Sequence, residues 1–169
     1  MYKWVSGDGG PLIILQKPVC DYWQGATDFE NCLMNGGTVE TDYDKICQCE
    51  DGVSIINRYE HDLIVLSDSE WRGLLYQADS GEIIVLQSFG SDIDVSQIIT
   101  RCQNDQPSLV LDFELKAQII RLLVGADTGK GKMYGFSEIS VQSGKKRCST
   151  YYYEDAQVVL IRDAEQLFR

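Results

Sequence analysis

The sequence predicts an α+β fold: one β-rich domain with antiparallel meanders and two or three short helices. Short apolar runs recur along the chain, and most of them lie between Gly, Pro, Asp or Ser residues, as strands joined by tight turns do. Only a few stretches carry helical signals. Because no linker, repeat or low-complexity tract divides the sequence, we expect residues 1–169 to form a single domain.

The first strand and the first helix are expected to adjoin. Leu12–Leu15 is a short apolar run that follows a Gly-Gly-Pro turn, which favours a buried strand. Pro18 suits the first turn of a helix, where its missing N–H needs no partner. This helix would carry Tyr22 and Trp23 onto the sheet. Gly25 would end it in the left-handed conformation.

Elements of the middle of the chain follow from turn residues and periodicity. Glu30–Leu33 is expected to be a short helix, and Lys45–Cys49 and Val53–Ile56 are expected to form a hairpin around Asp51-Gly52. Asp94–Cys102 carries apolar residues at i, i+3, i+4 and i+7, which indicates one face of a helix. An antiparallel meander is expected between residues 63 and 87, with strands at Leu63–Leu66, Trp71–Tyr76 and Ile83–Gln87.

The last third of the chain is also expected to be mainly strands. Leu109–Leu115 alternates apolar and polar residues, the pattern of a half-buried strand, and Ile119–Val124 is an apolar run. Ala164–Phe168 is expected to be a last helical turn. A closing meander is predicted at Gly135–Val141, Arg147–Tyr153 and Gln157–Ile161.

Charge is unevenly distributed along the sequence. The net charge is −11; residues 1–127 hold 21 acids and 8 bases, whereas residues 128–150 hold one acid and five bases. A negative body repels nucleic acid and attracts basic partners, although many acidic proteins are charged merely for solubility. We therefore expect no direct binding of nucleic acid.

The expected cellular compartment follows from the segments that the sequence lacks and from its cysteines. No apolar run approaches the ~18 residues that a membrane span needs, and the first residues contain no secretory apolar region. We therefore expect a cytoplasmic protein without a membrane partner. Its six cysteines are expected to be free thiols.

The N-terminal block resembles the Immunity protein 21 family. Its residues 9–15 read Gly-Gly-Pro-Leu-Ile-Ile-Leu, and residues 22–26 read Tyr-Trp-Gln-Gly-Ala, which contains the Trp-x-Gly motif of that family; the similarity covers Trp4 to Cys32. Such proteins are encoded beside toxins of bacterial polymorphic toxin systems. The resemblance implies a toxin inhibitor whose structural motif residues are Gly9, Gly10, Pro11, Trp23 and Gly25.

Catalytic and metal-binding patterns are weak. His61 is the only histidine and has no nucleophile motif beside it, so we expect no catalytic residue. Cys32, Cys47, Cys49 and His61 could supply four zinc ligands, but their spacing matches no zinc signature, and packing explains the cysteines as well. Residues 125–132 fail the phosphate-loop spacing. We expect neither a metal nor a cofactor.

The clearest candidate for a binding surface is the acidic stretch of residues 40–70, which holds nine acids and two bases with interleaved aromatic residues. Carboxylates would select a cationic partner, and Tyr and Trp are favoured at interface hot spots. The stretch could equally be a solvated edge with core aromatics. The predicted partner-binding residues are Asp42, Tyr43, Asp44, Glu50, Asp51, Tyr59, Glu60, Asp62, Asp68 and Glu70.

Together these observations lead to one functional hypothesis with two alternatives. We expect a non-catalytic immunity protein that occludes a cognate toxin with a basic surface, such as a nuclease, because a toxin that grips phosphates must expose Lys or Arg. The first alternative is a small carboxylate- or metal-dependent enzyme, which requires a pocket with two converging acids. The second is a scaffold or regulatory module unrelated to toxins.

Overall fold

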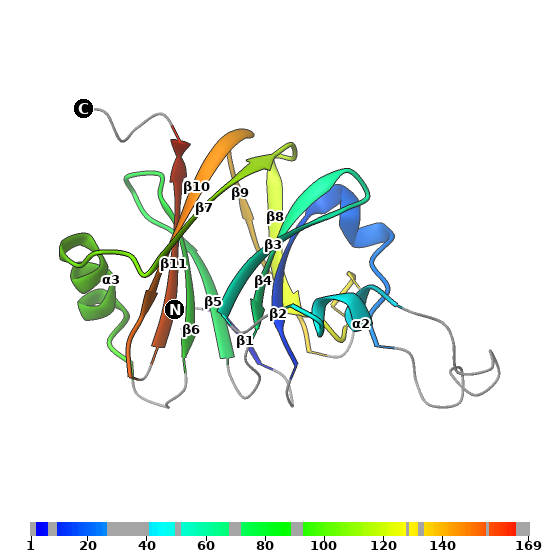
Figure 1. Cartoon of the computed structure of the whole chain (residues 1–169), viewed down its shortest axis with the longest axis horizontal. Coiled ribbons are helices and arrows are strands. Elements are labelled where there is room, and N and C mark those ends of the chain that lie inside the picture. The colour runs from blue at the N-terminus through cyan, green and yellow to red at the C-terminus, as the bar shows by residue number, and fades with distance from the viewer. Residues whose placement is uncertain are drawn as a thin grey trace.

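Two antiparallel sheets packed face to face make up the body of the computed structural model (Figure 1). The structure describes residues 3–6, 10–26, 41–49, 52–67, 72–88, 93–127, 129–131, 134–154 and 156–164. The six-stranded sheet has the order β1 (Trp4–Ser6), β5 (Arg72–Gln77), β6 (Ile83–Ser88), β11 (Ala156–Asp163), β10 (Gly144–Tyr152), β7 (Leu109–Leu115). The five-stranded sheet has the order β3 (Gly52–Arg58), β4 (His61–Ser67), β2 (Leu12–Gln16), β8 (Ile119–Val124), β9 (Ser137–Ser140).

Helical segments cover the outer face of each sheet, so the molecule has four layers. The α-helix α3 (Val95–Asn104) lies on the six-stranded sheet, at the left of Figure 1. The 3₁₀ helix η1 (Lys17–Asp21) and the α-helix α2 (Asp42–Ile46) lie on the five-stranded sheet, at the right. Among the described residues, none of these helices is long and apolar enough to cross a membrane.

The layering explains why several strands are apolar on both faces. In β2, Leu12 and Ile14 point into the core between the sheets. Ile13 and Leu15 point outward, under η1 and α2. All four side chains are buried. A strand buried on both faces reads as a continuous apolar run rather than as an alternating pattern.

The β-rich, antiparallel fold class is confirmed, with few helices among the described residues. Strands β7 and β8 have the predicted bounds, and β2, β5, β6, β10 and β11 match their predicted positions within a few residues. The predicted helix of residues 94–102 is α3, which begins after Asp94 because this carboxylate accepts hydrogen bonds from the N–H groups of Ser96 and Gln97. The expected helices at Glu30–Leu33 and Ala164–Phe168 lie wholly or largely outside the described residues.

The strands of each predicted meander are divided between the two sheets rather than lying in one. Strand β4 belongs to the five-stranded sheet, whereas β5 and β6 form a hairpin in the other sheet. Similarly, β9 and the β10–β11 hairpin belong to different sheets. The chain therefore passes from one sheet to the other between β4 and β5, and again between β9 and β10.

The predicted strand at Lys45–Cys49 is wrong. The segment from Asp42 to Ile46 is the helix α2, and it starts with a capping box: the Thr41 hydroxyl accepts from the Asp44 N–H, while the Asp44 carboxylate accepts from the Thr41 N–H at 2.7 Å. The hairpin with Val53–Ile56 is therefore also wrong. Strand β3 pairs with β4 and is an edge of its sheet.

Gly25 is required for a reason other than the predicted left-handed end of a helix. The 3₁₀ helix ends at Asp21, before Trp23. A Cβ atom on Gly25 would lie 2.3 Å from the carbonyl oxygen of Ala126. The glycine is needed because this backbone approaches so closely. Next to it, the Trp23 indole N–H donates to the Gly125 carbonyl at 3.1 Å.

The two halves of the N-terminal motif therefore meet the same segment, residues 125–127. The N–H of Gly125 donates to the carbonyl of Pro11 at 2.7 Å, and the N–H of Ala26 donates to the carbonyl of Ala126 at 2.9 Å. Gly10 has a φ of 90°, a conformation that favours glycine. Gly9 lies outside the described residues.

Candidate functional site

A buried carboxylate organises one end of the five-stranded sheet. Asp42, in the first turn of α2, is 1% exposed. Its Oδ1 accepts from the guanidinium of Arg58 at the end of β3, with 2.9 Å to Nε. Its Oδ2 accepts from the N–H of Gln24 at 2.9 Å and from the hydroxyl of Tyr59 at 2.8 Å. One side chain thus ties α2, the Trp-x-Gly segment and the β3–β4 turn together.

Two exposed tyrosines lie next to this buried group. The Tyr59 ring packs against the Tyr22 ring in a tilted arrangement, with 5.8 Å between the ring centroids, and the Tyr59 hydroxyl also donates to the Tyr22 carbonyl at 3.3 Å. Tyr22 is 65% exposed and Tyr59 is 41% exposed. The Arg58 guanidinium lies 5.2 Å from the Tyr59 ring centroid, within the range of a cation–π contact. We call Tyr22, Arg58 and Tyr59 the tyrosine patch.

The Tyr59 hydroxyl remains a proton donor at neutral pH. Burial of the hydroxyl, followed by its hydrogen bond to Asp42, raises the pKa of Tyr59 above its ordinary value. A rigid aromatic side chain loses little conformational entropy when it binds a partner.

The turn that presents Tyr59 is strained. Tyr59 and Glu60 form a two-residue connection between β3 and β4, and both have positive φ values, of 52° and 63°. Such turns favour Asn-Gly, because residues with a larger side chain are destabilised there, by about 1–2 kcal/mol each. Strain of this kind concentrates at functional sites.

A second buried polar side chain, Gln16, joins this end of the sheet to β7. Its Nε2 donates to the carbonyls of Asp62 and Glu114 at 2.9 and 3.0 Å. Its Oε1 accepts from the N–H groups of Lys116 and Ala117 at 2.8 and 2.9 Å. His61 Nδ1 is 3.2 Å from the same oxygen, so the single histidine is part of this structural network.

The predicted partner-binding acids fall into three groups. Asp42 and Asp44 make the internal bonds described above, so their contribution to a partner site would be to position other residues. Glu60 is exposed in the turn, and Asp62 is half-buried, with its carboxylate accepting from Asn57 and from the N–H of Glu114. Outside the described residues lie Glu50, Asp51, Asp68 and Glu70.

Tyr43, another predicted contact residue, is half-buried and packs across Gly10. Burial, followed by its hydrogen bond with Cys47, raises the pKa of Tyr43 to about 12. The sequence analysis did not select Tyr22 as a contact residue. Its position between the end of η1 and the Trp-x-Gly motif was the available signal, but its exposure depends on the tertiary structure.

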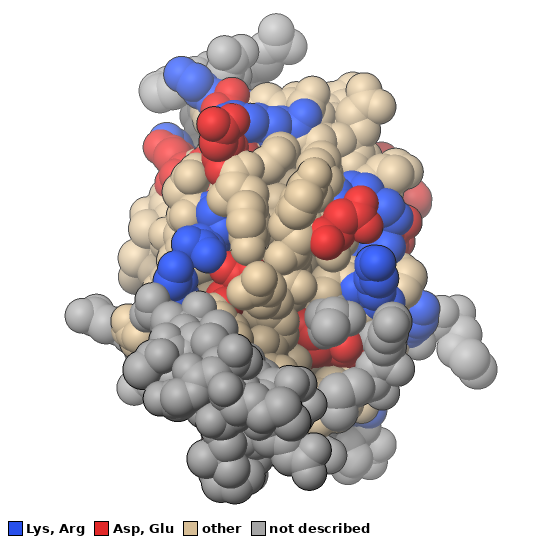
Figure 2. Space-filling view, turned by 90° about the vertical axis from the view of Figure 1, so that its right-hand side faces the viewer, with Lys and Arg blue, Asp and Glu red and all other residues tan. Residues whose placement is uncertain are grey.

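The surface on this side of the molecule has mixed charge. Figure 2 shows the right-hand face of Figure 1, where Lys and Arg side chains lie among Asp and Glu side chains and uncharged residues fill most of the described area. In the described part of this face, acids do not form a continuous field. Local recognition would therefore combine aromatic contacts with a few charges.

Two observations on the described residues concern the metal and enzyme alternatives. Within them, no group of three or more His, Cys, Asp or Glu side chains could hold a metal ion, and Cys47 is exposed while Cys49 is half-buried; Cys32 lies outside them. A polar pocket of about 290 Å³ lies between the β5–β6 turn and the end of β11. Its two carboxylates pair with neighbouring bases, as Lys146–Asp163 and Arg162–Glu82.

Comparisons with known proteins agree with the motif. The model of the family described as Immunity protein 21 matches residues 3–108, which include the Trp-x-Gly segment and all three residues of the tyrosine patch. Neither a curated protein nor a solved structure matches the chain. Since the match spans more than half of the sequence, this chain belongs to the Immunity protein 21 family.

Proposed function

We propose that the chain is a cytoplasmic immunity protein that binds a cognate bacterial toxin and neutralises it by occlusion, without chemistry of its own. Family membership suggests the inhibitory function. The five described cysteines are free thiols, which suits a reducing compartment.

The tyrosine patch supports this proposal more strongly than any other feature of the structure. Exposed Tyr side chains with a neighbouring Arg are the residue types most enriched at binding hot spots. Here they are held by a fully buried carboxylate and a strained turn. Strain of this kind lowers the stability of the fold and is typical of functional sites. A pre-organised patch loses less entropy on association.

We further propose that the toxin presents a basic surface, as a nuclease does. The net charge of −11 would attract such a partner over a distance. Close to the patch, Glu60 and Asp62 would meet its Lys or Arg side chains. The remaining predicted contacts, Tyr43, Asp44 and the acids outside the described residues, belong to the same proposal.

The direct test is binding to the polypeptide encoded by the neighbouring gene. We expect a stable complex at micromolar concentrations, and we expect Tyr59→Ala and Tyr22→Ala each to weaken it by about 30-fold or more, the effect of losing ~2 kcal/mol at a hot spot. The affinity of this complex should fall as the salt concentration rises, because salt screens the attraction between opposite charges.

A matched control is Arg101→Ala on α3. Arg101 is exposed and stacks on a tyrosine, Tyr153, but it lies on the opposite outer layer. This variant should bind as the original chain does. If both tyrosine variants bind normally, the patch is not the contact surface; if no complex forms with the neighbouring gene product, the proposed function is wrong.

A further inference from the structure

Strand β7 is the outer strand of the six-stranded sheet, with β10 as its neighbour on one side. The backbone groups of Tyr153, just after β10, bond to Ala156 on the side of β11. Because backbone groups alternate along a strand, the odd-numbered residues of β10 bond to β11 and the even-numbered residues bond to β7. In the observed register, the even-numbered residues of β10 oppose Leu109, Leu111, Phe113 and Leu115.

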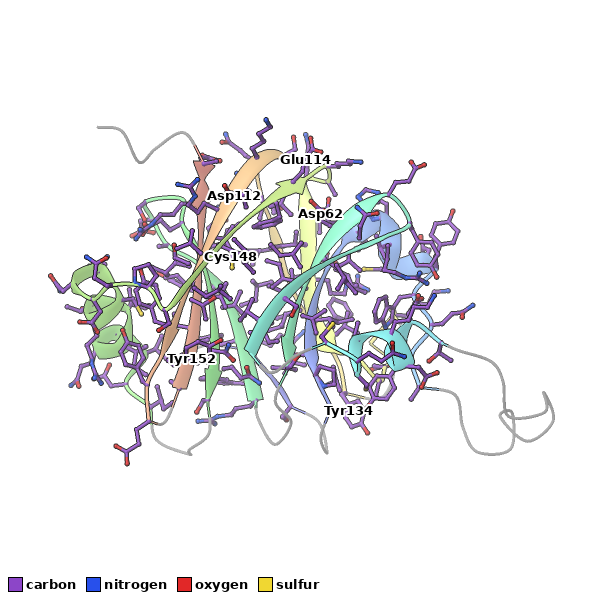
Figure 3. All side chains as sticks on the ribbon, in the orientation of Figure 1. Asp62, Asp112, Glu114, Tyr134, Cys148 and Tyr152 are labelled. Atoms are coloured by element: carbon purple, nitrogen blue, oxygen red, sulfur yellow. The ribbon has the colours of Figure 1, made fainter. Side chains whose placement is uncertain are left out.

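The even-numbered residues of β7 therefore direct their N–H and C=O groups away from the sheet. Glu114 confirms this, because its N–H donates to the Asp62 carboxylate at 2.9 Å and its carbonyl accepts from Gln16 at 3.0 Å. Figure 3 shows Asp62 beside the Glu114 end of β7, with Asp112 farther back along the strand. Side chains from the other sheet thus cap this end of the edge.

The rest of the edge is open. Among the described residues, no group bonds to the N–H or C=O of Val110 or Asp112. Val110 is 46% exposed as a residue, and the side chain of Asp112 is 61% exposed. Proteins usually cover or disrupt an exposed strand edge of this kind, because it can pair with another strand.

The side chains of β7 indicate which types of residue a strand paired with it should carry on each face. On the solvent face lie Val110, Asp112 and Glu114, of which two are acidic. The Asp112 carboxylate already accepts from Arg147 of β10 at 2.7 and 3.0 Å, but a carboxylate has further acceptor sites for a second base. On the other face, Leu109 and Leu111 are half-buried against the core between the sheets. A strand laid beside β7 would gain most from basic residues on the solvent face and apolar residues on the other, because cross-strand pairs stabilise a sheet.

We infer that the open half of β7 receives an extended segment of the cognate toxin, in which basic residues alternate with apolar ones. This inference rests on the proposed function, since it assigns the strand to the same partner. The capped end of the edge adjoins the β3–β4 turn that carries Tyr59 of the tyrosine patch: Asp62 bonds to Glu114, and Lys116, just after β7, donates to the carbonyl of Glu60. A second copy of this chain is a poorer occupant, because two chains of charge −11 repel each other.

Amide hydrogen exchange measured by NMR tests the inference residue by residue. In the free chain, the N–H groups of Val110 and Asp112 should exchange much faster than those of Leu111 and Phe113, which bond to β10. In the complex with the neighbouring gene product, exchange at Val110 and Asp112 should slow by at least tenfold. Leu111 and Phe113 should be protected in both states and serve as internal controls.

Variants give a second readout. Val110→Pro removes an outward N–H without removing a bond to β10 and should weaken the complex at least tenfold, whereas Val110→Ala, which keeps the N–H, should bind within about threefold. Asp112→Asn with Glu114→Gln should weaken binding and reduce its dependence on salt. Melting temperatures of the free variants show whether each still folds.

Each contrary result has a distinct meaning. A complex in which Val110 and Asp112 exchange as fast as in the free chain overturns the strand inference and leaves the proposed function standing. Protection of these amides in the free chain, constant or rising with concentration, also overturns it, because the edge would then be covered already or used for self-association. Failure to form any complex overturns both.

Discussion

At the scale of single residues, two buried polar side chains hold the candidate site together. Gln16 makes four hydrogen bonds to backbone groups at 2.8–3.0 Å, so its burial leaves neither its oxygen nor its nitrogen unpaired. Asp42 accepts from Arg58, Tyr59 and the N–H of Gln24. A polar group that is fully satisfied in this way specifies one arrangement of the elements it joins.

Replacement of Asp42 by Ala should destabilise the fold. The substitution leaves the guanidinium of Arg58 and the hydroxyl of Tyr59 without their acceptor. Breaking a fully buried pair costs about 3–5 kcal/mol; because the Arg58 side chain is 28% exposed and water can solvate it, we expect a loss of about 2–3 kcal/mol. Urea denaturation measures it.

Asp79→Ala is the matched control for this substitution. Asp79 is exposed in the β5–β6 connection, and its removal should change the free energy of unfolding by less than about 0.5 kcal/mol. Similar values for the two variants would show that the Asp42 network contributes little to stability.

The cysteines should differ sharply in reactivity. Burial raises the pKa of Cys148 to about 12, and it also raises the pKa values of Cys20 and Cys102. Cys47 is exposed. With iodoacetamide at pH 8, Cys47 should be modified first among the five cysteines that the structure describes, while Cys148 should react only after unfolding, because the reagent attacks the thiolate.

Mass spectrometry of the labelled peptides checks the order, and a urea-denatured sample shows that every site is detectable. Equal labelling of Cys47 and Cys148 in the native chain would contradict the four-layer packing, which places Cys148 between the sheets.

At the scale of elements, Glu138 joins three segments on the five-stranded sheet. Its Oε2 accepts from Lys17 of η1 at 2.8 Å and from Arg121 of β8 at 2.6 Å. Arg121 in turn donates to the Gly129 carbonyl and lies 3.7 Å from the centroid of the Phe136 ring. A single carboxylate on the edge strand β9 thus fixes η1 and the residues after β8.

This arrangement predicts a pH dependence. The hydrogen bond from Lys17, followed by the bonds from Arg121, lowers the pKa of Glu138. A lowered folded pKa means that its stabilisation is complete above the unfolded pKa of about 4.3 and is lost as the pH falls through the folded pKa. Glu138→Gln should therefore cost about 1 kcal/mol at pH 7 and progressively less below pH ~4.

Unfolding of both chains by urea between pH 7 and pH 3 measures this difference. Glu154→Gln, a change at an exposed residue after β10, is the control and should differ little from the original chain at every pH. A difference for Glu138→Gln that grows on acidification would contradict the lowered pKa.

Local patterns predicted much of this architecture, and they failed where local evidence is ambiguous. The period of residues 94–102 predicted α3, and the alternation at Leu109–Leu115 predicted β7. Residues 41–44 carry a capping-box pattern, but the apolar Ile46 and the cysteines after it suit a strand as well. Which sheet each strand joins could not be predicted, because strands of both sheets show the same periodicity.

The candidate site could be predicted only in part. Glu60 and Tyr59 lie in a turn that the sequence placed in the acidic stretch, but the contact between Tyr22 and Tyr59 joins residues 37 positions apart. The open edge at Val110 follows from strand order, which depends on long-range pairing. Asp42 was predicted to be a partner-binding acid, because nothing in the sequence indicates that the Arg58 guanidinium bonds to its carboxylate.

At the scale of the whole molecule, the family match and the folding unit have different limits. The match ends at residue 108, just before β7. Both sheets, however, take strands from each side of this limit: β2 pairs with β8, and β6 pairs with β11. The Trp-x-Gly segment also docks on residues 125–127. We therefore propose that residues 1–169 unfold as one cooperative unit.

A chain truncated after residue 108 should fail to fold. It would lose β7–β11, which removes a neighbour from β2 and from β6 and takes Phe113, Leu115, Ile120 and Leu122 out of the core between the sheets. Burial of one such side chain contributes about 1.5–3 kcal/mol, so the loss of these four removes about 6–12 kcal/mol, which is comparable with the ~5–15 kcal/mol by which a domain is stable. A chain that ends at residue 164 keeps every described element and should unfold in one transition at an unchanged midpoint. Circular dichroism and the dispersion of amide signals in NMR spectra distinguish these outcomes; a truncated chain with a dispersed spectrum would show that residues 1–108 fold alone and that the β7 edge belongs to a separate addition.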